Sequence, residues 1–148
     1  MAQAITVTLS GNVLLTGKGE TAKIIIDWTS GSDGAVSKAI CHEQRNASGH
    51  ANVYSSKMRG YISAVETSPG SSGDLTNDLP TDAYDITLLD DHSYDVAGGS
   101  LANRSGTVTE KVIPSSQVPV ESDLTLTIAN AGDSKKGRVL IWIDPFES

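Results

Sequence analysis

The sequence predicts an all-β protein, a single-domain antiparallel β-sandwich with a jelly-roll-like arrangement. Apolar residues recur with period two, as expected for half-buried strands whose side chains alternate between core and solvent. Clusters of Gly, Ser, Asn and Asp separate the apolar runs at short intervals, which is typical of sandwiches and barrels. The 148 residues contain no repeat or composition shift, so we expect one domain over residues 1–148, with candidate extended arms at both ends.

The strands are predicted from these alternating runs. Ile5, Val7 and Leu9 alternate with threonines, and residues 124–128 show the same alternation. Predicted strands cover residues 3–9, 12–16, 22–28, 35–42, 58–67, 84–89, 93–97, 106–113, 123–129 and 138–143, of which we expect about eight or nine to form. Residues 35–42 fit a helical turn equally well, and residues 101–104 are expected to form one short helical turn.

Two longer segments are predicted to be loops. Residues 43–56 are polar and lack any sustained period, and residues 65–81 are rich in Ser, Gly, Asp and Asn. Loops of this length in a compact domain usually have a function or contact a partner. We therefore take the first loop as the candidate partner-contact site, with Asn46, His50, Asn52 and Tyr54 as its contact residues.

The composition argues against two classes of partner. The formal net charge is −7, which disfavours nucleic acid, because affinity for phosphate backbones comes from clustered Lys and Arg. The only basic cluster, Lys135, Lys136 and Arg138, is expected at a solvated hairpin tip. No apolar run approaches the roughly 20 residues of a membrane-spanning helix, so we expect no membrane association.

The cysteine content and the start of the chain indicate the compartment. Residues 1–4 lack the basic and apolar regions of a signal peptide. The single Cys41 cannot form a disulfide within the chain, which suits assembly in a reducing cytoplasm. We expect Cys41 to act as a small hydrophobic residue.

No catalytic constellation is apparent, so we expect neither enzyme activity nor a cofactor. His42, His50 and His92 are dispersed, and no nucleophile elbow accompanies them. Cys41 and His42 are adjacent, so on a strand they would point to opposite faces and could not form an ion pair. Residues 17–21 include a lysine between glycines but lack the spacing of a phosphate loop.

An acidic turn raises the question of a bound ion. Asp90, Asp91 and Asp95 have the oxygen ligands that hard cations prefer. A calcium loop would need glycine and glutamate where this chain has Val96 and Ala102. We therefore favour a solvated acidic turn and expect no metal site, and the sequence leaves the ion question open.

The aromatic residues are few, which bears on sugar binding. Trp28 and Trp142 both occur in the period-two frame of apolar strands, so we expect both in the core. Tyr54, in the predicted polar loop, is the best aromatic candidate for a contact with a partner.

Several motifs resemble a family of small virion structural proteins of tailed bacteriophages, of the capsid decoration or cement type. They are residues 80–90, 95–96 and 98–104, the final hairpin 124–133, and the following Lys-Gly-Arg-Val at 136–139. The resemblance covers residues 22–143 and is strongest after residue 79. It implies a virion β-domain and no catalytic residue.

Within this class we expect a cement protein that binds the major capsid protein or other virion proteins on an assembled head, because the chain shows no catalytic chemistry, one β domain and long polar loops. We also expect a homo-oligomer, a dimer or trimer, assembled in the host cytoplasm and located in the virion. A tail, baseplate or head-to-tail connector component is the alternative. A carbohydrate- or receptor-binding module is a further alternative from a different class.

Overall fold

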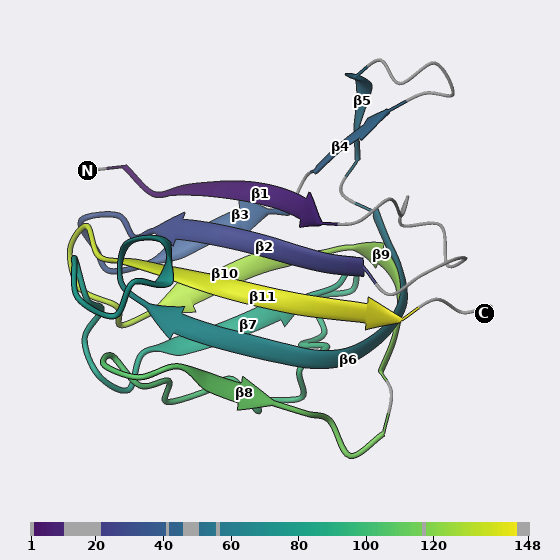
Figure 1. Ribbon diagram of the computed structural model, residues 1–148. Coiled ribbons are helices and arrows are strands. Elements are labelled where there is room, and N and C mark those ends of the chain that lie inside the picture. Colours follow the sequence, from purple (N-terminus) through teal and green to yellow (C-terminus); the bar gives the residue numbers. More distant parts are fainter. Residues whose placement is uncertain are drawn as a thin grey trace.

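The computed structural model describes residues 2–10, 22–40, 42–45, 51–55, 57–116 and 118–144 (Figure 1). Within these ranges the protein is all-β, as predicted, with two main antiparallel sheets of six and three strands. The regular helical structure there is a single turn of 3-10 helix, η1 (Ser71–Gly73). None of these residues form a helix long and apolar enough to cross a membrane.

The larger sheet has the order β1-β2-β11-β6-β8, and β9 also pairs with β6. Its strands are β1 (Ala4–Ser10), β2 (Ala22–Thr29), β6 (Lys57–Pro69), β8 (Glu110–Val112), β9 (Val118–Asp123) and β11 (Lys136–Asp144). The strands β8 and β9 share one edge of β6, because β8 pairs with residues 65–67 and β9 with residues 57–62.

The smaller sheet has the order β3-β10-β7, formed by β3 (Val36–Ala39), β7 (Asp85–Leu89) and β10 (Thr125–Ala129). The chain passes between the two sheets from β2 to β3, from β6 to β7, from β7 to β8, from β9 to β10 and from β10 to β11. A separate hairpin consists of β4 (His42–Arg45) and β5 (Ala51–Ser55), and it extends away from the two main sheets (Figure 1).

One hydrophobic cluster joins the facing sides of both sheets. Alternate residues of β11 are buried, beginning at Gly137 and ending at Ile143, and β7 and β10 alternate in the same way. Trp28 of the larger sheet lies against Tyr84, with ring centroids 5.6 Å apart. Other buried members are Ile24, Ile26, Val36, Ile62, Ile86, Leu88, Leu126, Ile128, Val139 and Ile141.

Four local predictions are wrong. Residues 93–97 form a turn with one isolated bridge from Asp95 to Leu89, and residues 106–113 contain only the three-residue β8. The predicted loop 65–81 begins inside β6, which continues to Pro69, and residues 101–104 form a turn without helix. Residues 35–42 adopt the strand alternative over 36–39. The predicted strand 12–16 lies outside the described residues.

The sequence prediction also missed β9, whose Val-Pro-Val-Glu-Ser-Asp sequence contains a proline and two acids. Proline is tolerated in a strand at a sheet edge, and among the described strands β6 is the partner of β9. The prediction of an extended N-terminal arm falls partly on β1, which is paired along its length with β2. The predicted C-terminal arm around Phe146 lies outside the described residues.

Candidate protein-interaction face

Two of the four predicted partner-contact residues lie in a hairpin strand instead of an irregular loop. Asn52 and Tyr54 belong to β5, and Tyr54 is opposite Glu43 in the register with β4. Asn46 and His50 lie outside the described residues. The expectation of a loop over 43–56 is therefore wrong for both strands, although the hairpin does project from the body (Figure 1).

Carboxylates between residues 82 and 95 hold the backbone in place. Asp95 Oδ1 accepts hydrogen bonds from the N–H groups of Leu88 (3.2 Å) and Ala97 (3.0 Å), and its Oδ2 accepts one from Gly99 (2.8 Å). Asp82 accepts the N–H of Gly106 in the same manner. The carboxylate of Asp95 thus takes the backbone N–H of Leu88 at the edge of β7, which a neighbouring strand would otherwise pair with. This explains why residues 93–97 do not form a full strand.

The acidic turn itself is internally hydrogen-bonded. Asp90 accepts the N–H groups of Tyr94 and His92, and the hydrogen bond from Tyr94 is the main reason that the pKa of Asp90 is lowered. Asp91 lies 2.9 Å from Nδ1 of His92. Asp90, Asp91 and His92 form a cluster, but Asp95 is not part of it. The three predicted aspartates are therefore not assembled into a single ligand set.

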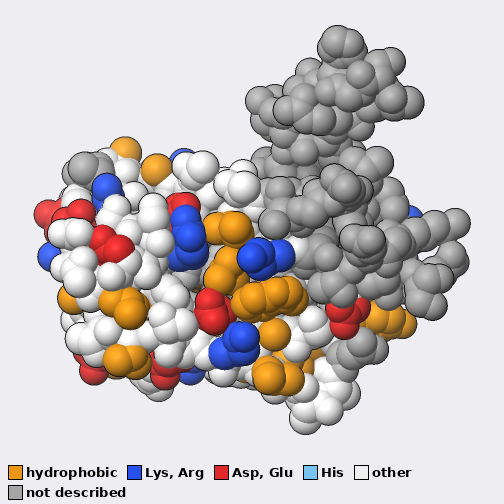
Figure 2. Space-filling view, viewed as in Figure 1, with side chains coloured by type: hydrophobic (Ala, Val, Ile, Leu, Met, Phe, Trp, Pro, Cys, Tyr) orange, Lys and Arg blue, Asp and Glu red, His pale blue; other side chains and the backbone are white. Residues whose placement is uncertain are grey.

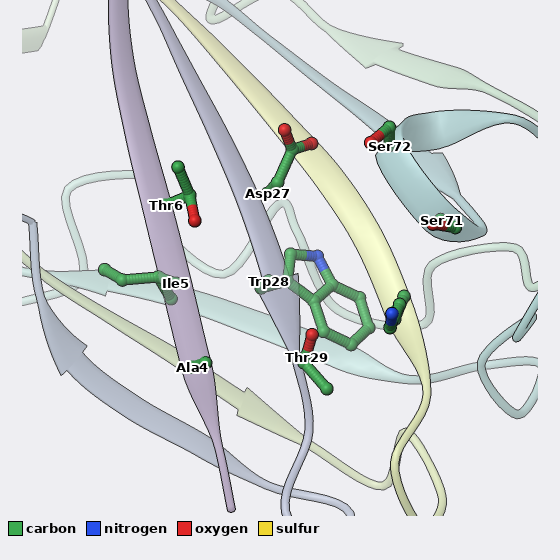
Figure 3. Close-up of a pocket in the computed structure, with 9 residues that line it drawn as sticks. Ala4, Ile5, Thr6, Asp27, Trp28, Thr29, Ser71 and Ser72 are labelled. Carbon is green, nitrogen blue, oxygen red and sulfur yellow. The ribbon is translucent and has the colours of Figure 1, made fainter.

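Two hollows in the described surface do not resemble catalytic pockets. One of about 130 Å³ lies with β1 and β2 on one side and Ser71 and Ser72 of η1 on the other (Figure 3). It is smaller than the roughly 300–1,000 Å³ of typical ligand sites. The other, of about 340 Å³, lies beside Tyr94, Ile113 and Pro114, and no carboxylate, imidazole or amine side chain lines it.

The outer face of the six-stranded sheet exposes an apolar centre surrounded by charges (Figure 2). Two cross-strand rows run over it, Lys23–Trp142–Ala64 and Ile25–Leu140–Glu66–Lys111. We call these seven residues the Trp142 face. The four apolar members, Ile25, Ala64, Leu140 and Trp142, are half-buried and point away from the core.

The prediction that both tryptophans are in the core is correct for Trp28, which is 1% exposed, and wrong for Trp142. Residues 139–143, Val-Leu-Ile-Trp-Ile, are apolar at every position, so alternation within this run does not tell the inner side from the outer. The flanking charges of Lys136, Arg138 and Asp144 mark the side of Trp142 as the outer one. This apolar run, with its flanking charges, is the feature of the sequence that could have indicated an outward-facing Trp142. An antiparallel sheet usually exposes polar residues on its solvent side, so apolar residues on both sides of β11 indicate a second contact surface.

Charges on and beside the Trp142 face are arranged around its apolar centre. Nζ of Lys111 lies 4.8 Å from the centroid of the Trp142 ring and 3.9 Å from Glu66. On the neighbouring row, Arg138 donates from Nε to Oδ1 of Asp27 (2.7 Å) and from Nη2 to Oδ2 (3.0 Å). This hydrogen bond raises the pKa of Arg138. Arg138 is therefore fixed within β11 and is not at a solvated hairpin tip.

No protein-family model, curated protein or solved structure matches this chain. The function must therefore be argued from the surface and from the motifs. The Trp142 face shares two features with protein–protein contacts, a tryptophan and charged residues beside apolar ones.

Proposed function

We propose that this chain is a structural protein of a tailed-bacteriophage virion, and specifically a capsid decoration or cement protein. Its partner would be the major capsid protein of the assembled head, and it would act without enzyme activity or cofactor. The observation that carries the proposal is the Trp142 face, an exposed apolar sheet surface with a tryptophan at its centre. The virion assignment itself rests on the motif resemblance after residue 79.

The mode of action follows from mass action. A protein that binds the mature lattice better than its free subunits shifts the equilibrium toward the assembled shell. Many equivalent contacts on a symmetric shell act together, so a modest affinity at each face is sufficient. Self-association as a dimer or trimer would add to this effect by linking neighbouring capsid subunits.

We also propose a jelly-roll-like β-sandwich as the finer architecture. In a jelly roll of eight strands, one sheet has the order first, eighth, third, sixth, and the other the order second, seventh, fourth, fifth. Taking β2 as the first strand, the order β2-β11-β6-β9 fits the first sheet and β3-β10-β7 fits three quarters of the second. The fifth strand would correspond to residues 94–104, which form one isolated bridge with Leu89 of β7 and one with Tyr84 just before it.

A tail, baseplate or connector position is the second candidate within the virion, since the same face could bind those proteins. The carbohydrate-binding alternative is less well supported. Stacking on a sugar requires an open aromatic ring, whereas the ammonium group of Lys111 lies over Trp142. A glycan array with the purified protein tests this alternative, and we expect no binding.

Copy number in purified virions separates the virion positions. We expect on the order of hundreds of copies for a cement protein, against about a dozen or fewer for a connector. Complete absence from the virion would overturn the proposal.

A binding experiment then tests the face. In cosedimentation with heads that lack the protein, Leu140→Ser with Trp142→Ser should abolish binding, whereas Ile113→Ser should not. Ile113 is a suitable control because it is a large apolar residue, 71% exposed, that is not part of the Trp142 face. Circular dichroism melting checks that each variant is folded, and equal binding by both variants would exclude this face as the docking surface.

A further inference from the structure

Strand β1 forms an end of the six-stranded sheet. In the part of the chain that the structure describes, its strand partner is β2, with an unbroken register from Ala4–Thr29 to Ser10–Lys23. Its start is fixed to the second sheet, because the side chain of Gln3 accepts the backbone N–H of Ser37 in β3. The backbone groups on the other side of β1 are therefore held in place in a rigid sheet edge.

The sequence of β1 lacks the usual protection of such an edge. Natural edge strands avoid further pairing by being short or by containing charges, proline or bulges. The seven residues Ala-Ile-Thr-Val-Thr-Leu-Ser contain no charge, proline or glycine, and their register with β2 has no bulge. Five of the seven are β-branched or leucine, which favours pairing.

The other edges of the two main sheets are protected against pairing with a further strand. The strand β8 has only three residues, two of which are Glu110 and Lys111, and β3 has four residues that include Lys38. The strand β9 contains Pro119. The outer side of β7 is bridged by residues 94–104. Among the described strands of these sheets, β1 is thus the one long edge strand without these features. It pairs with β2, and β4 approaches it without pairing.

The side chains of β1 are consistent with an edge that continues into another sheet. Ile5 and Val7 are half-buried and pack against the core from its open side, whereas Thr6 and Thr8 are exposed on the outer face. An added strand with the same alternation would cover Ile5 and Val7 with apolar residues and place threonines opposite threonines.

We propose that β1 pairs antiparallel with β1 of a second copy of this chain, about a two-fold axis at Val7. This register uses all seven residues, places Thr6 opposite the partner's Thr8, and preserves the alternation of faces. An antiparallel edge is self-complementary under two-fold symmetry, as a closed dimer requires. Since β1 is uncharged, two such edges meet without local repulsion although each chain has a net charge of −7.

This dimer rests on the proposed function, which includes a homo-oligomer, and it names the edge of β1 as the surface through which the copies associate. It is tested with purified protein alone, so failure of the dimer and failure of capsid binding are distinguishable. Sedimentation equilibrium of the full chain over roughly two orders of magnitude in concentration should show a reversible monomer–dimer equilibrium.

The decisive comparison uses charge-matched variants. Thr6→Lys with Thr8→Lys puts like charges opposite each other across the axis, so we expect dimerisation to weaken by about tenfold or more. Ser115→Lys with Ser116→Lys adds the same charge on exposed residues between β8 and β9 and should dimerise as the natural chain does. Thermal melting confirms that both variants are folded.

Hydrogen exchange locates the contact independently of the variants. Amides of β1 should exchange more slowly at dimeric than at monomeric concentrations, while those of β8 and β9 should not change. A natural chain that stays monomeric throughout, an edge variant that dimerises as tightly as its control, or protection confined to another edge would each overturn the proposal.

Discussion

Gly137 leaves the space that the indole ring of Trp28 occupies. The two residues are directly opposite each other in the register of β11 with β2. A Cβ atom on Gly137 would lie 2.5 Å from Cζ2 of Trp28 and 2.8 Å from its Nε1. Gly137 is thus required by packing inside a strand. The hairpin tip that the sequence predicts around residues 135–138 lies earlier, at residues 130–135.

Gly137→Ala should therefore destabilise the fold by about 1–3 kcal/mol, as expected for overpacking a dense core. Urea unfolding followed by tryptophan fluorescence measures this loss. Gly31→Ala is the control, since the nearest atom to its new Cβ would be the end of the Asp33 side chain at 3.1 Å. Equal losses in both variants would contradict the packing explanation.

Tyr84→Phe should leave the stability unchanged or raise it by up to about 1 kcal/mol at neutral pH. The hydroxyl of Tyr84 is buried, and its approach to the side chain of Thr67 does not have the geometry of a hydrogen bond, so its removal costs little. Urea unfolding at pH 7 checks this, with the exposed Tyr94→Phe as control. A clear loss in Tyr84→Phe alone would show that the hydroxyl has a stabilising contact.

The free energy of unfolding of Tyr84→Phe should fall less at alkaline pH than that of the natural chain. Burial raises the pKa of Tyr84 to about 12 from an ordinary value of 10.0, against the opposing charge of Arg104. A raised pKa means stability that is present below pH 10 and lost as pH rises toward 12. Urea unfolding measured across this pH window should show a steeper loss of stability for the natural chain than for Tyr84→Phe. Parallel losses in the two proteins would contradict this prediction.

Asp74→Ala should lower the melting temperature at pH 7. The carboxylate of Asp74 accepts hydrogen bonds from the N–H groups of Asn77 (3.0 Å) and Thr76 (2.9 Å), which lower its pKa to about 2. A lowered pKa gives stability above pH 3.8 that is lost as pH falls toward 2. The difference in melting temperature between Asp74→Ala and the natural chain should shrink across that window, and a difference that stays constant would contradict this explanation.

Excess chelator should leave the melting temperature of the protein unchanged. Asp90 and Asp95 already use their carboxylate oxygens to accept backbone N–H groups, so an ion is not needed to hold this turn. Calorimetry with and without EDTA checks this. A fall in melting temperature that added calcium reverses would show that an ion binds there.

Much of the fold follows from local alternation. The strands β2, β7 and β10 each alternate buried and half-buried or exposed residues within the ranges predicted for them, because side-chain direction in a strand reverses at every residue. Prediction failed where a contact distant in sequence decided the structure. Residues 93–97 did not become a strand because Asp95 satisfies the backbone of β7 with its side chain.

The candidate interaction face was predicted less well than the fold. Polarity and lack of period pointed to residues 43–56, whereas the Trp142 face gathers residues from β2, β6, β8 and β11. Those strands are up to 119 positions apart between Lys23 and Trp142, so no local pattern connects them.

The sequence by itself determined an all-β chain with defined turns, because period-two alternation and turn chemistry act over a few neighbouring residues. Only the tertiary structure decided which side of the apolar run 139–143 is buried, since that run has apolar residues on both sides and the second sheet can cover only one. The burial of Trp28 over Gly137 and the exposure of Trp142 both follow from that choice.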